Sequence, residues 1–336
     1  MGKTVLVTGA SGFIGSHLAE ALLGDGHEVR TIVRRPETLE RHGFARHPGF
    51  RAFQGDLLEP RSITEACRGV QQVYHLAGII STRTGDRKKL FDINVKGSVN
   101  LMNALKETRP EKIVYLASIF ALAKGERHRP ATEESFYNLE DVHVDYFESK
   151  RAAQLEMEKF EMDGMPVVYV YPGFCYGPGD IYVSSSVFIL SFLRGELPVL
   201  FDGGQNILDV RDCARGLIQG MEKGVVGRKY LIGDHNLTFK ELAAALATVT
   251  GKKAPSVALP RPLVMGLGFV AEKLAPRFPL NRQSAEAACH YWFYDTSRAR
   301  RELGYSGRPL EETLRDAVAW FRENGYDQRG FKPPVH

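Results

Sequence analysis

Short apolar runs rich in β-branched residues alternate with helix-like segments through the first half of the chain. Parallel strands need a crossover connection between them, and strands covered by such crossover helices on both faces are apolar throughout. The alternation therefore predicts an α/β fold built on a doubly wound parallel sheet. The expected strands lie at 3–9, 27–34, 49–56, 71–78, 111–118 and 165–173, and the expected helices at 12–26, 62–69, 90–107 and 143–163.

The turn between the first expected strand and the first expected helix reads TGASGFIG, with Gly9, Gly12 and Gly15 at regular spacing. Glycine lets the backbone approach a pyrophosphate closely, and the helix N-terminus offers N–H groups and the positive end of its dipole. The spacing differs from the common G-x-G-x-x-G fingerprint, and a purely structural glycine turn is the alternative. Its place between a strand and a helix favours dinucleotide binding in a Rossmann-like fold.

Two arginines, Arg34 and Arg35, stand at the end of the second expected strand, about 20 residues after the last glycine. A carboxylate at this place would bind the ribose 2′-OH of NAD, whereas an arginine accommodates the 2′-phosphate of NADP. Plain surface charges are the alternative interpretation. The pair indicates NADP as the cofactor, with NAD as the second choice.

Past residue 174 the strand–helix rhythm ends in the Gly- and Pro-rich stretch PGFCYGPGD. No internal repeat or low-complexity linker divides the sequence, so the second lobe is expected to be interleaved with the first. We expect a dinucleotide-binding domain at 1–175 with 203–236, and a smaller α+β substrate-binding lobe at 176–202 with 237–330. Within the second half we expect a strand at 228–234 and helices at 214–224, 238–251 and 309–325, the last with Leu314, Ala317, Val318 and Phe321 at helical spacing.

The charge balance limits the partners of the chain. Lys and Arg number 44 against 40 Asp and Glu, so the net charge of +4 is too small and too dispersed to indicate nucleic-acid binding. The four cysteines stand far apart without a CxxC pair, which indicates reduced thiols and no zinc or other metal site.

The sequence contains no segment that we expect to cross a membrane. The first residues lack the charged region and free apolar core of a signal peptide. The most apolar later run, at 263–276, is too short to span a bilayer and carries Glu272 and Lys273. We therefore expect a cytoplasmic protein that acts on a small molecule.

Tyr146 and Lys150 stand four residues apart at the start of an expected helix, in DYFESK. Side chains at this spacing share one face of a helix, so the phenol and the ammonium can act on one point. The same spacing also arises by chance in an ordinary amphipathic helix. The surrounding motifs have to decide between the two.

The motifs together resemble those of the extended short-chain dehydrogenase/reductase superfamily, which includes NAD(P)-dependent epimerases and dehydratases, from one end of the chain to the other. Within it the chain is most similar to the dihydroflavonol-4-reductase-like branch, with its hopanoid-associated sugar epimerases, through GGQNILDVRDCARGL and KYLIGDHNLTFKEL. The other matching stretches are TGASGFIGSH, GDL, VYHLAG, INVKGS, VYLAS, the Tyr146-x-x-x-Lys150 pair, PGFCYGPGD and DTSRARRELGY.

The resemblance implies a catalytic set of Ser118, Tyr146 and Lys150, with Asn94 as a supporting residue. Tyr146 would give a proton to a forming alkoxide and Ser118 would hydrogen-bond the carbonyl oxygen. Lys150 is expected to lower the pKa of the phenol from its ordinary value near 10 and to hold the nicotinamide ribose. The family's double serine reads Ala117-Ser118 here, which keeps the second serine.

The resemblance also implies a cofactor-binding set. Asp56 would meet the adenine, although an acid that caps a turn is the alternative for this residue. The expected cofactor-binding residues are Gly9, Ser11, Gly12, Phe13, Ile14, Gly15, Arg34, Arg35, Asp56, Leu57, Leu76, Ala77, Gly78, Tyr146, Lys150, Pro172, Gly173 and Phe174.

Two reactions share this catalytic set, and we expect an NADP(H)-dependent reduction of a ketone or aldehyde on a small, apolar substrate. The alternative is a nucleotide-sugar epimerase or dehydratase with tightly bound cofactor. Such members resemble one another in cationic and amide groups that grip a diphosphate, where this chain has Tyr171, Phe174 and Gln205. Arg211 could replace them. A non-catalytic dinucleotide sensor is the second alternative, and the presence of both Tyr146 and Lys150 counts against it.

Several aromatic residues could wall an apolar substrate pocket or simply belong to the core. A homodimer through helices near 88–107 and 146–163 is also left open by the resemblance. The aromatic candidates are Phe188, Phe192, Phe269, Trp292, Phe293 and Tyr294.

Overall fold

The computed structural model describes residues 2–83, 85–274, 281–328 and 330–334. Its main layer is a seven-stranded sheet in the order β10-β6-β5-β4-β1-β2-β3, with every neighbouring pair parallel. The predicted α/β fold with a doubly wound parallel sheet is confirmed. The strands are β1 (Thr4–Thr8), β2 (Glu28–Val33), β3 (Phe50–Gln54), β4 (Gln72–His75), β5 (Lys112–Leu116), β6 (Val167–Pro172) and β10 (Lys229–Ile232).

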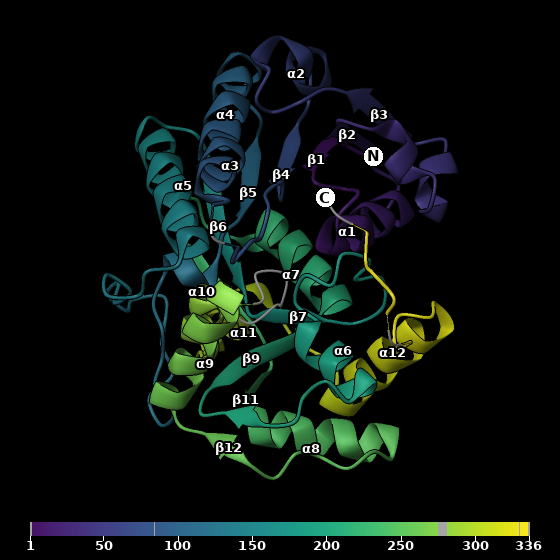
Figure 1. The fold of residues 1–336 in the computed structure, drawn as a ribbon. Coiled ribbons are helices and arrows are strands. Elements are labelled where there is room, and N and C mark those ends of the chain that lie inside the picture. Colours follow the sequence, from purple (N-terminus) through teal and green to yellow (C-terminus); the bar gives the residue numbers. More distant parts are fainter. Residues whose placement is uncertain (1, 84, 275–280, 329, 335–336) are drawn as a thin grey trace.

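Helices cover both faces of this sheet (Figure 1). Along β1, Leu6 packs into the core on one face, whereas Val5 and Val7 pack into the core on the other, because successive strand residues point to opposite faces. The first face is covered by α2 (Pro60–Cys67), α4 (Gly97–Thr108) and α5 (Asp145–Met162), and the second by α1 (Phe13–Gly24), α7 (Val210–Lys223) and α11 (Ser297–Leu303).

The single helix expected at 90–107 has a break in its regular winding. It consists of α3 (Arg87–Phe91), a π-helical segment (Asp92–Lys96) and α4. A π-helical turn holds one residue more than an α-helical turn and occurs often at functional sites. The segment contains Asn94, one of the expected site residues.

The second lobe lies below the main sheet in Figure 1 and has its own core, which includes Phe192, Leu242 and Phe321. Thr238 caps the start of α8 through a capping box with Glu241. The helices expected at 238–251 and 309–325 are found as α8 and α12. Its elements are β7 (Phe174–Tyr176), α6 (Val187–Arg194), β8 (Leu200–Phe201), β9 (Gly204–Asp209), β11 (His235–Thr238), α8 (Phe239–Thr250), β12 (Ala258–Leu259), β13 (Tyr291–Trp292) and α12 (Leu310–Glu323).

Strand β9 pairs with β7, β11 and β13 to form a four-stranded sheet. These strands come from both sides of the expected boundaries at residues 175, 203 and 236, so the division into the two predicted domains stays a prediction.

Two further helices, α9 (Arg261–Leu274) and α10 (Arg282–Ala288), pack together beside this sheet. Residues 275 and 276 of the apolar run lie outside the described residues. None of the described helices is both long and apolar enough to cross a membrane.

Ion pairs join the end of the chain to the start of α7. The buried carboxylate of Asp212 accepts hydrogen bonds from Arg308 Nε and Nη2, both at 3.0 Å. Arg211 Nη2 donates to Asp316 Oδ2 on α12 at 2.6 Å and to Asp209 Oδ2 at 2.7 Å. Because Asp209 and Asp212 are each only 1% exposed, these pairs fix α7 against the C-terminal segment.

Candidate active site

The candidate residues gather at the carboxyl ends of neighbouring parallel strands. The strands β1, β4, β5 and β6 lie side by side in the main sheet. Their carboxyl ends therefore meet at one edge, where open α/β sheets bind ligands. This edge brings together the glycine loop after β1, the segment 76–78 after β4, Ser118 after β5, and Gly173 after β6.

The glycine loop has a backbone that only glycine fits. Gly9 has a φ of +79°, in the left-handed region, and its carbonyl accepts a hydrogen bond from Gly12 N at 2.9 Å. A Cβ on Gly15 would lie 2.1 Å from the same carbonyl oxygen. The loop and the first turn of α1 are thus packed backbone against backbone.

The N-terminus of α1 can receive a phosphate. Its cap, Gly12, has no side chain to bond the first N–H groups, and within this fully described helix no acidic residue stands in the first turn. The N–H groups of Phe13 and Ile14, in that turn, have no carbonyl partner inside the helix. With Ser11 beside them, these groups fit the pyrophosphate of a dinucleotide.

The segment after β4 lies between the loop and the catalytic candidates. A Cβ on Gly9 would lie 3.1 Å from Ala77 N, next to Leu76. A Cβ on Gly78 would lie 3.0 Å from Asn94 Oδ1 and 3.1 Å from Lys150 Nζ. The cofactor candidates and the catalytic candidates therefore meet at Gly78.

The remaining cofactor candidates lie at the neighbouring strand ends. Arg34 and Arg35 are exposed at the end of β2. Asp56 Oδ1 accepts a hydrogen bond from Leu58 N at 2.9 Å, so this acid does cap a turn. Its contact with an adenine stays a prediction, as do the contacts of Leu57, Pro172, Gly173 and Phe174.

Tyr146 lies in the first turn of α5, buried to 6% exposure, and Ser118 is buried beside it at 8%. Burial raises the pKa of Tyr146 to about 12, and a side-chain hydrogen bond with Ser118 is the contribution that lowers it. Removal of the phenol from water outweighs this hydrogen bond, and the expected lowering of the pKa by Lys150 stays a prediction. At neutral pH Tyr146 carries its proton.

Lys150 lies one turn further along α5, and its Nζ is close to Asn94 and Gly78. Burial lowers the pKa of Lys150 to about 8, since a low dielectric disfavours the ammonium form. The side chain remains mostly protonated at pH 7, so its ammonium can donate hydrogen bonds near Gly78.

Asn94 is the centre of a buried hydrogen-bond network. Its Oδ1 accepts from Ile79 N at 2.8 Å, and its Nδ2 donates to Ile79 O at 3.1 Å and to Ser149 Oγ at 3.0 Å. Ser149 Oγ in turn donates to Tyr146 O at 2.8 Å. The amide therefore connects the segment after β4 to the first turn of α5.

A second chain of hydrogen bonds, which the sequence did not suggest, holds Asn94 from the other side. Thr8 Oγ1 accepts from Leu76 N and Ala77 N, both at 3.1 Å, so its own proton is left for His75 Nδ1 at 2.8 Å. His75 Nε2 then donates to Ser98 Oγ at 2.8 Å.

Ser98 Oγ donates to Asn94 O at 2.7 Å, which completes the chain. Burial and the nearby Lys150 lower the pKa of His75 to about 3, so the ring stays neutral. A histidine inside the apolar strand VYHLAG was the signal that could have revealed it.

An aromatic cluster surrounds the phenol of Tyr146. Phe120 lies edge-on to Tyr146 at 5.7 Å between ring centroids and to Trp292 at 4.7 Å. Phe120 also stacks on Phe147 at 4.0 Å and meets Phe174 at 5.9 Å. Sequence reasoning missed Phe120, because it lies in a 3₁₀ turn after β5 that only the fold brings to Tyr146.

The aromatic residues named as pocket or core divide clearly. Phe269, on α9, is 43% exposed, whereas the other five are buried. Among the buried ones, Trp292 contacts the aromatic cluster around Tyr146. The five that are buried are Phe188, Phe192, Trp292, Phe293 and Tyr294.

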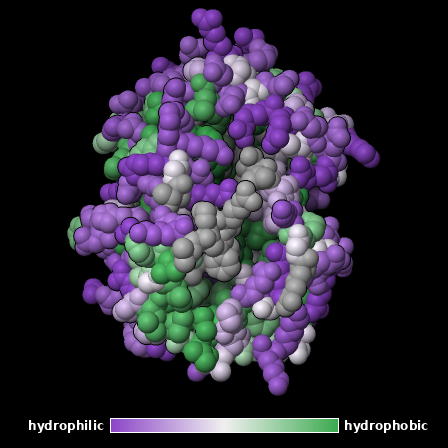
Figure 2. Space-filling view, viewed as in Figure 1, coloured by the Kyte–Doolittle hydropathy of each residue, from purple (hydrophilic) through white to green (hydrophobic). Residues whose placement is uncertain are grey.

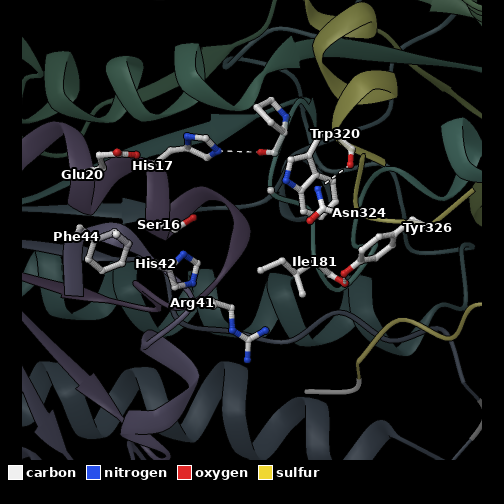
Figure 3. A pocket seen from close by; sticks show the side chains of 13 residues that line it. Ser16, His17, Glu20, Arg41, His42, Phe44, Ile181, Trp320, Asn324 and Tyr326 are labelled. Atoms are coloured by element: carbon white, nitrogen blue, oxygen red, sulfur yellow. Dashed lines mark hydrogen bonds between the residues drawn. The ribbon is translucent and has the colours of Figure 1, made fainter. Parts of the chain in front are cut away.

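A separate cavity of about 560 Å³ opens on the outer side of α1. Figure 3 shows that its lining side chains come from α1 (Ser16, His17 and Glu20), from the segment after β2, and from the end of the chain. His17 Nε2 donates to Pro178 O at 2.9 Å across it. The catalytic candidates do not line this cavity, so it is distinct from the site around Tyr146.

Comparison with known proteins agrees with this geometry. The model of the NAD dependent epimerase/dehydratase family matches residues 5–233. The chain is 32% identical to sterol demethylase protein B of Methylococcus capsulatus over 96% of its own length and 99% of that protein. It is 31% identical to a putative dihydroflavonol 4-reductase of Synechocystis over 97% of its length and 96% of that protein.

Among solved structures, the chain superposes on gox2253 with a TM-score of 0.84 and 31% identity, covering 96% of this chain and 99% of that one. The chain belongs to the NAD dependent epimerase/dehydratase family of extended short-chain dehydrogenases/reductases, in its dihydroflavonol-reductase-like part, and is an NAD(P)-dependent oxidoreductase.

Proposed function

We propose that the protein is an NADP(H)-dependent reductase that converts a ketone or aldehyde of a small apolar substrate to the alcohol. The observation that carries this proposal is the buried, protonated phenol of Tyr146 beside Ser118, inside an aromatic cluster. A phenol that holds its proton at neutral pH is equipped to donate it to a forming alkoxide.

Each catalytic side chain has a distinct part in this reaction. When bound, the cofactor supplies the hydride to the carbonyl carbon. Tyr146 donates its proton to the carbonyl oxygen, and the Ser118 hydroxyl hydrogen-bonds the same oxygen as charge develops on it. Lys150 holds the ribose through its ammonium. Asn94 acts through these residues, because it fixes the first turn of α5.

The surroundings of Tyr146 support an apolar substrate. Phe120 and Trp292 lie edge to face at 4.7 Å beside the phenol, and Phe174 closes the same cluster. Aromatic walls bind apolar ligands by burial of their surface. The names of two full-length relatives, a sterol demethylase protein and a putative dihydroflavonol 4-reductase, point to substrates of this kind.

The groups near the second lobe argue against a nucleotide-sugar substrate. Arg211, the cation that could grip a diphosphate, is bound by the carboxylates of Asp209 and Asp316, which raise its pKa. Gln205 Oε1 accepts a hydrogen bond from Tyr176 OH at 2.7 Å, and Tyr171 is fully buried. A diphosphate would have to break the ion pairs of Arg211 before this residue could bind it.

The proposal predicts stoichiometric consumption of NADPH with an added apolar ketone or aldehyde. Purified protein is incubated with such compounds and, in parallel, with UDP- and dTDP-sugars, while the absorbance of NADPH is followed and products are separated. A substrate-dependent fall in absorbance, with the nucleotide sugars unchanged, is the expected result. Epimers of a nucleotide sugar without net loss of NADPH would show that the alternative reaction is correct.

We also propose that Arg34 and Arg35 select NADP over NAD. Both are exposed at the end of β2, where a 2′-phosphate would lie beyond the ribose. Arg34→Asp is expected to raise the Kd for NADPH by about 10- to 100-fold, because it removes a charged hydrogen bond and adds repulsion. The Kd for NADH should change little or fall.

The measurement is a fluorescence titration with each cofactor, and Arg46→Asp is the matched control. Arg46 is also exposed, at the end of the second 3₁₀ turn after β2 (Gly43–Arg46), and its replacement by Asp changes the net charge equally. Equal affinities of the wild type for NADPH and NADH would mean that the arginines do not contact the cofactor.

Two broader features also belong to the proposal. Four free, buried cysteines support a location in the reducing cytoplasm.

Leu155 and Met162, exposed to 41% and 75% on the outer side of α5, support a homodimer through this helix.

A further inference from the structure

Helix α9 has an outward face that is almost entirely apolar. Figure 2 shows apolar residues gathered over α9 and the strand before it, at the lower left of the molecule. The exposed members, which we call the α9 patch, are Val257, Leu263, Leu267, Phe269 and Val270, exposed to 55%, 55%, 49%, 43% and 50%.

The α9 patch is not the side of the helix that holds the fold together. The inward side of α9 is fixed by Val264, which is fully buried, and by Gly268, where a Cβ would lie 2.8 Å from Ala285 Cβ. The outward residues Leu263, Leu267 and Val270 follow one another at helical spacing on the solvent side. Contiguous exposed apolar side chains of this kind mark a docking surface.

Cations flank the patch. The ring centroid of Phe269 lies 4.4 Å from Lys273 Nζ and 5.8 Å from the guanidinium carbon of Arg282. Glu272, whose Oε2 accepts a hydrogen bond from Arg282 N at 3.2 Å, is the acid at this border. Arg261 stands at the other end of α9, paired with Glu286. An apolar helical face with lysine and arginine at its border is complementary to a lipid surface that carries negative headgroups.

The patch is also connected to the catalytic helix. Gln283, in the first turn of α10, accepts from Asp145 N at 3.1 Å and donates to Asp145 Oδ2 at 2.8 Å. Asp145 is the residue before Tyr146 and begins α5. α9, which bears the patch, therefore packs on α10, and α10 contacts the first residue of α5, next to Tyr146.

We propose that the α9 patch docks the protein on the surface of an anionic lipid bilayer. Helix α9 has 14 residues, about 21 Å at 1.5 Å per residue, which is short of the roughly 30 Å of a hydrocarbon core, so it lies along the interface. That such docking brings an apolar, lipid-dissolved substrate to Tyr146 rests on the proposed function. The binding to lipid does not, and it can be tested without turnover.

The test is sedimentation of the full chain with vesicles of phosphatidylcholine alone or mixed with phosphatidylglycerol. We expect binding to the mixed vesicles that weakens as salt is raised. The pair Leu267→Glu with Val270→Glu should lower the partition coefficient by about tenfold or more, because it places two charges in the apolar contact.

The matched control is Val225→Glu with Val226→Glu, since these valines are exposed to 53% and 45% between α7 and β10, away from α9. This control pair changes the net charge by the same amount and should bind the mixed vesicles as the wild type does. Thermal melting checks that both pairs fold. Absence of wild-type binding to mixed vesicles, or equal loss in the control pair, would overturn the proposal. So would a wild-type dimer in light scattering that the α9 pair alone dissociates, since a second copy would then cover the patch.

Discussion

Replacement of Tyr146 by Phe is expected to lower kcat by about a thousandfold, the usual contribution of a positioned proton donor. The change removes only the hydroxyl. The ring keeps its edge-to-face contacts with Phe120 at 5.7 Å and Phe147 at 6.2 Å, so the stability of the protein and its Kd for NADPH should stay close to those of the wild type. Steady-state kinetics on a ketone substrate and a fluorescence titration with NADPH measure the two quantities.

Tyr171→Phe is the matched control for this prediction. Tyr171 is also fully buried in the main sheet, and its hydroxyl has no hydrogen-bond partner among the described atoms. Tyr171→Phe also removes one tyrosine hydroxyl, but away from Ser118 and Lys150, and should leave kcat unchanged. A Tyr146→Phe variant that keeps a tenth or more of the wild-type kcat would contradict the role of Tyr146 as the acid, since only about 1.4 kcal/mol of the barrier would then depend on it.

Replacement of Gly15 by Ala is expected to abolish measurable binding of NADPH at concentrations that saturate the wild type. A Cβ at this position would lie 2.1 Å from Gly9 O and 3.0 Å from Ala10 Cα. Both atoms are backbone, so the loop must move, and with it the N–H groups that we expect to face the phosphates. Overpacking of this kind also costs about 1–3 kcal/mol of stability.

Gly24→Ala, at the other end of the same helix, separates this effect from a general effect of alanine. A Cβ on Gly24 has nothing within 4 Å. This control should bind NADPH as the wild type does and melt at the same or a slightly higher temperature, because alanine favours the helix by up to about 1 kcal/mol. A Gly15→Ala variant with the wild-type Kd would mean that the loop does not contact the cofactor.

The main sheet could be predicted from the sequence because both of its faces are covered. Residues on either face, such as Leu6 and Val7, are then equally apolar, and the run stands out without knowledge of its neighbours. The π-helical segment could not be predicted. It places Asn94 against Ile79, which is 15 residues away, and no local preference encodes that contact.

The active site shows the same division between local and distant causes. The rule that parallel strand ends meet at one edge placed Ser118 at the ligand-binding edge, whereas its pairing with Tyr146 was expected from the resemblance to the family. The direction of the shift in the pKa of Tyr146 depends on burial among side chains from other elements, and sequence spacing carried no information about it. Likewise, the pairing of Arg211 with Asp316, 105 residues later, removed a candidate diphosphate anchor that the sequence alone had kept.

The ion pairs between α7 and the C-terminal segment have a consequence for how the protein is made. The backbone N–H and the guanidinium that satisfy Asp212 belong to Arg308, which a ribosome adds 96 residues later. Until Arg308 leaves the exit tunnel, burial of α7 against the main sheet would leave that carboxylate with Arg215, 3.6 Å away, but without the hydrogen bonds from Arg308, and loss of a buried pair costs up to ~3–5 kcal/mol. Burial of α7 against the main sheet is therefore expected to become favourable only when Arg308 can reach Asp212.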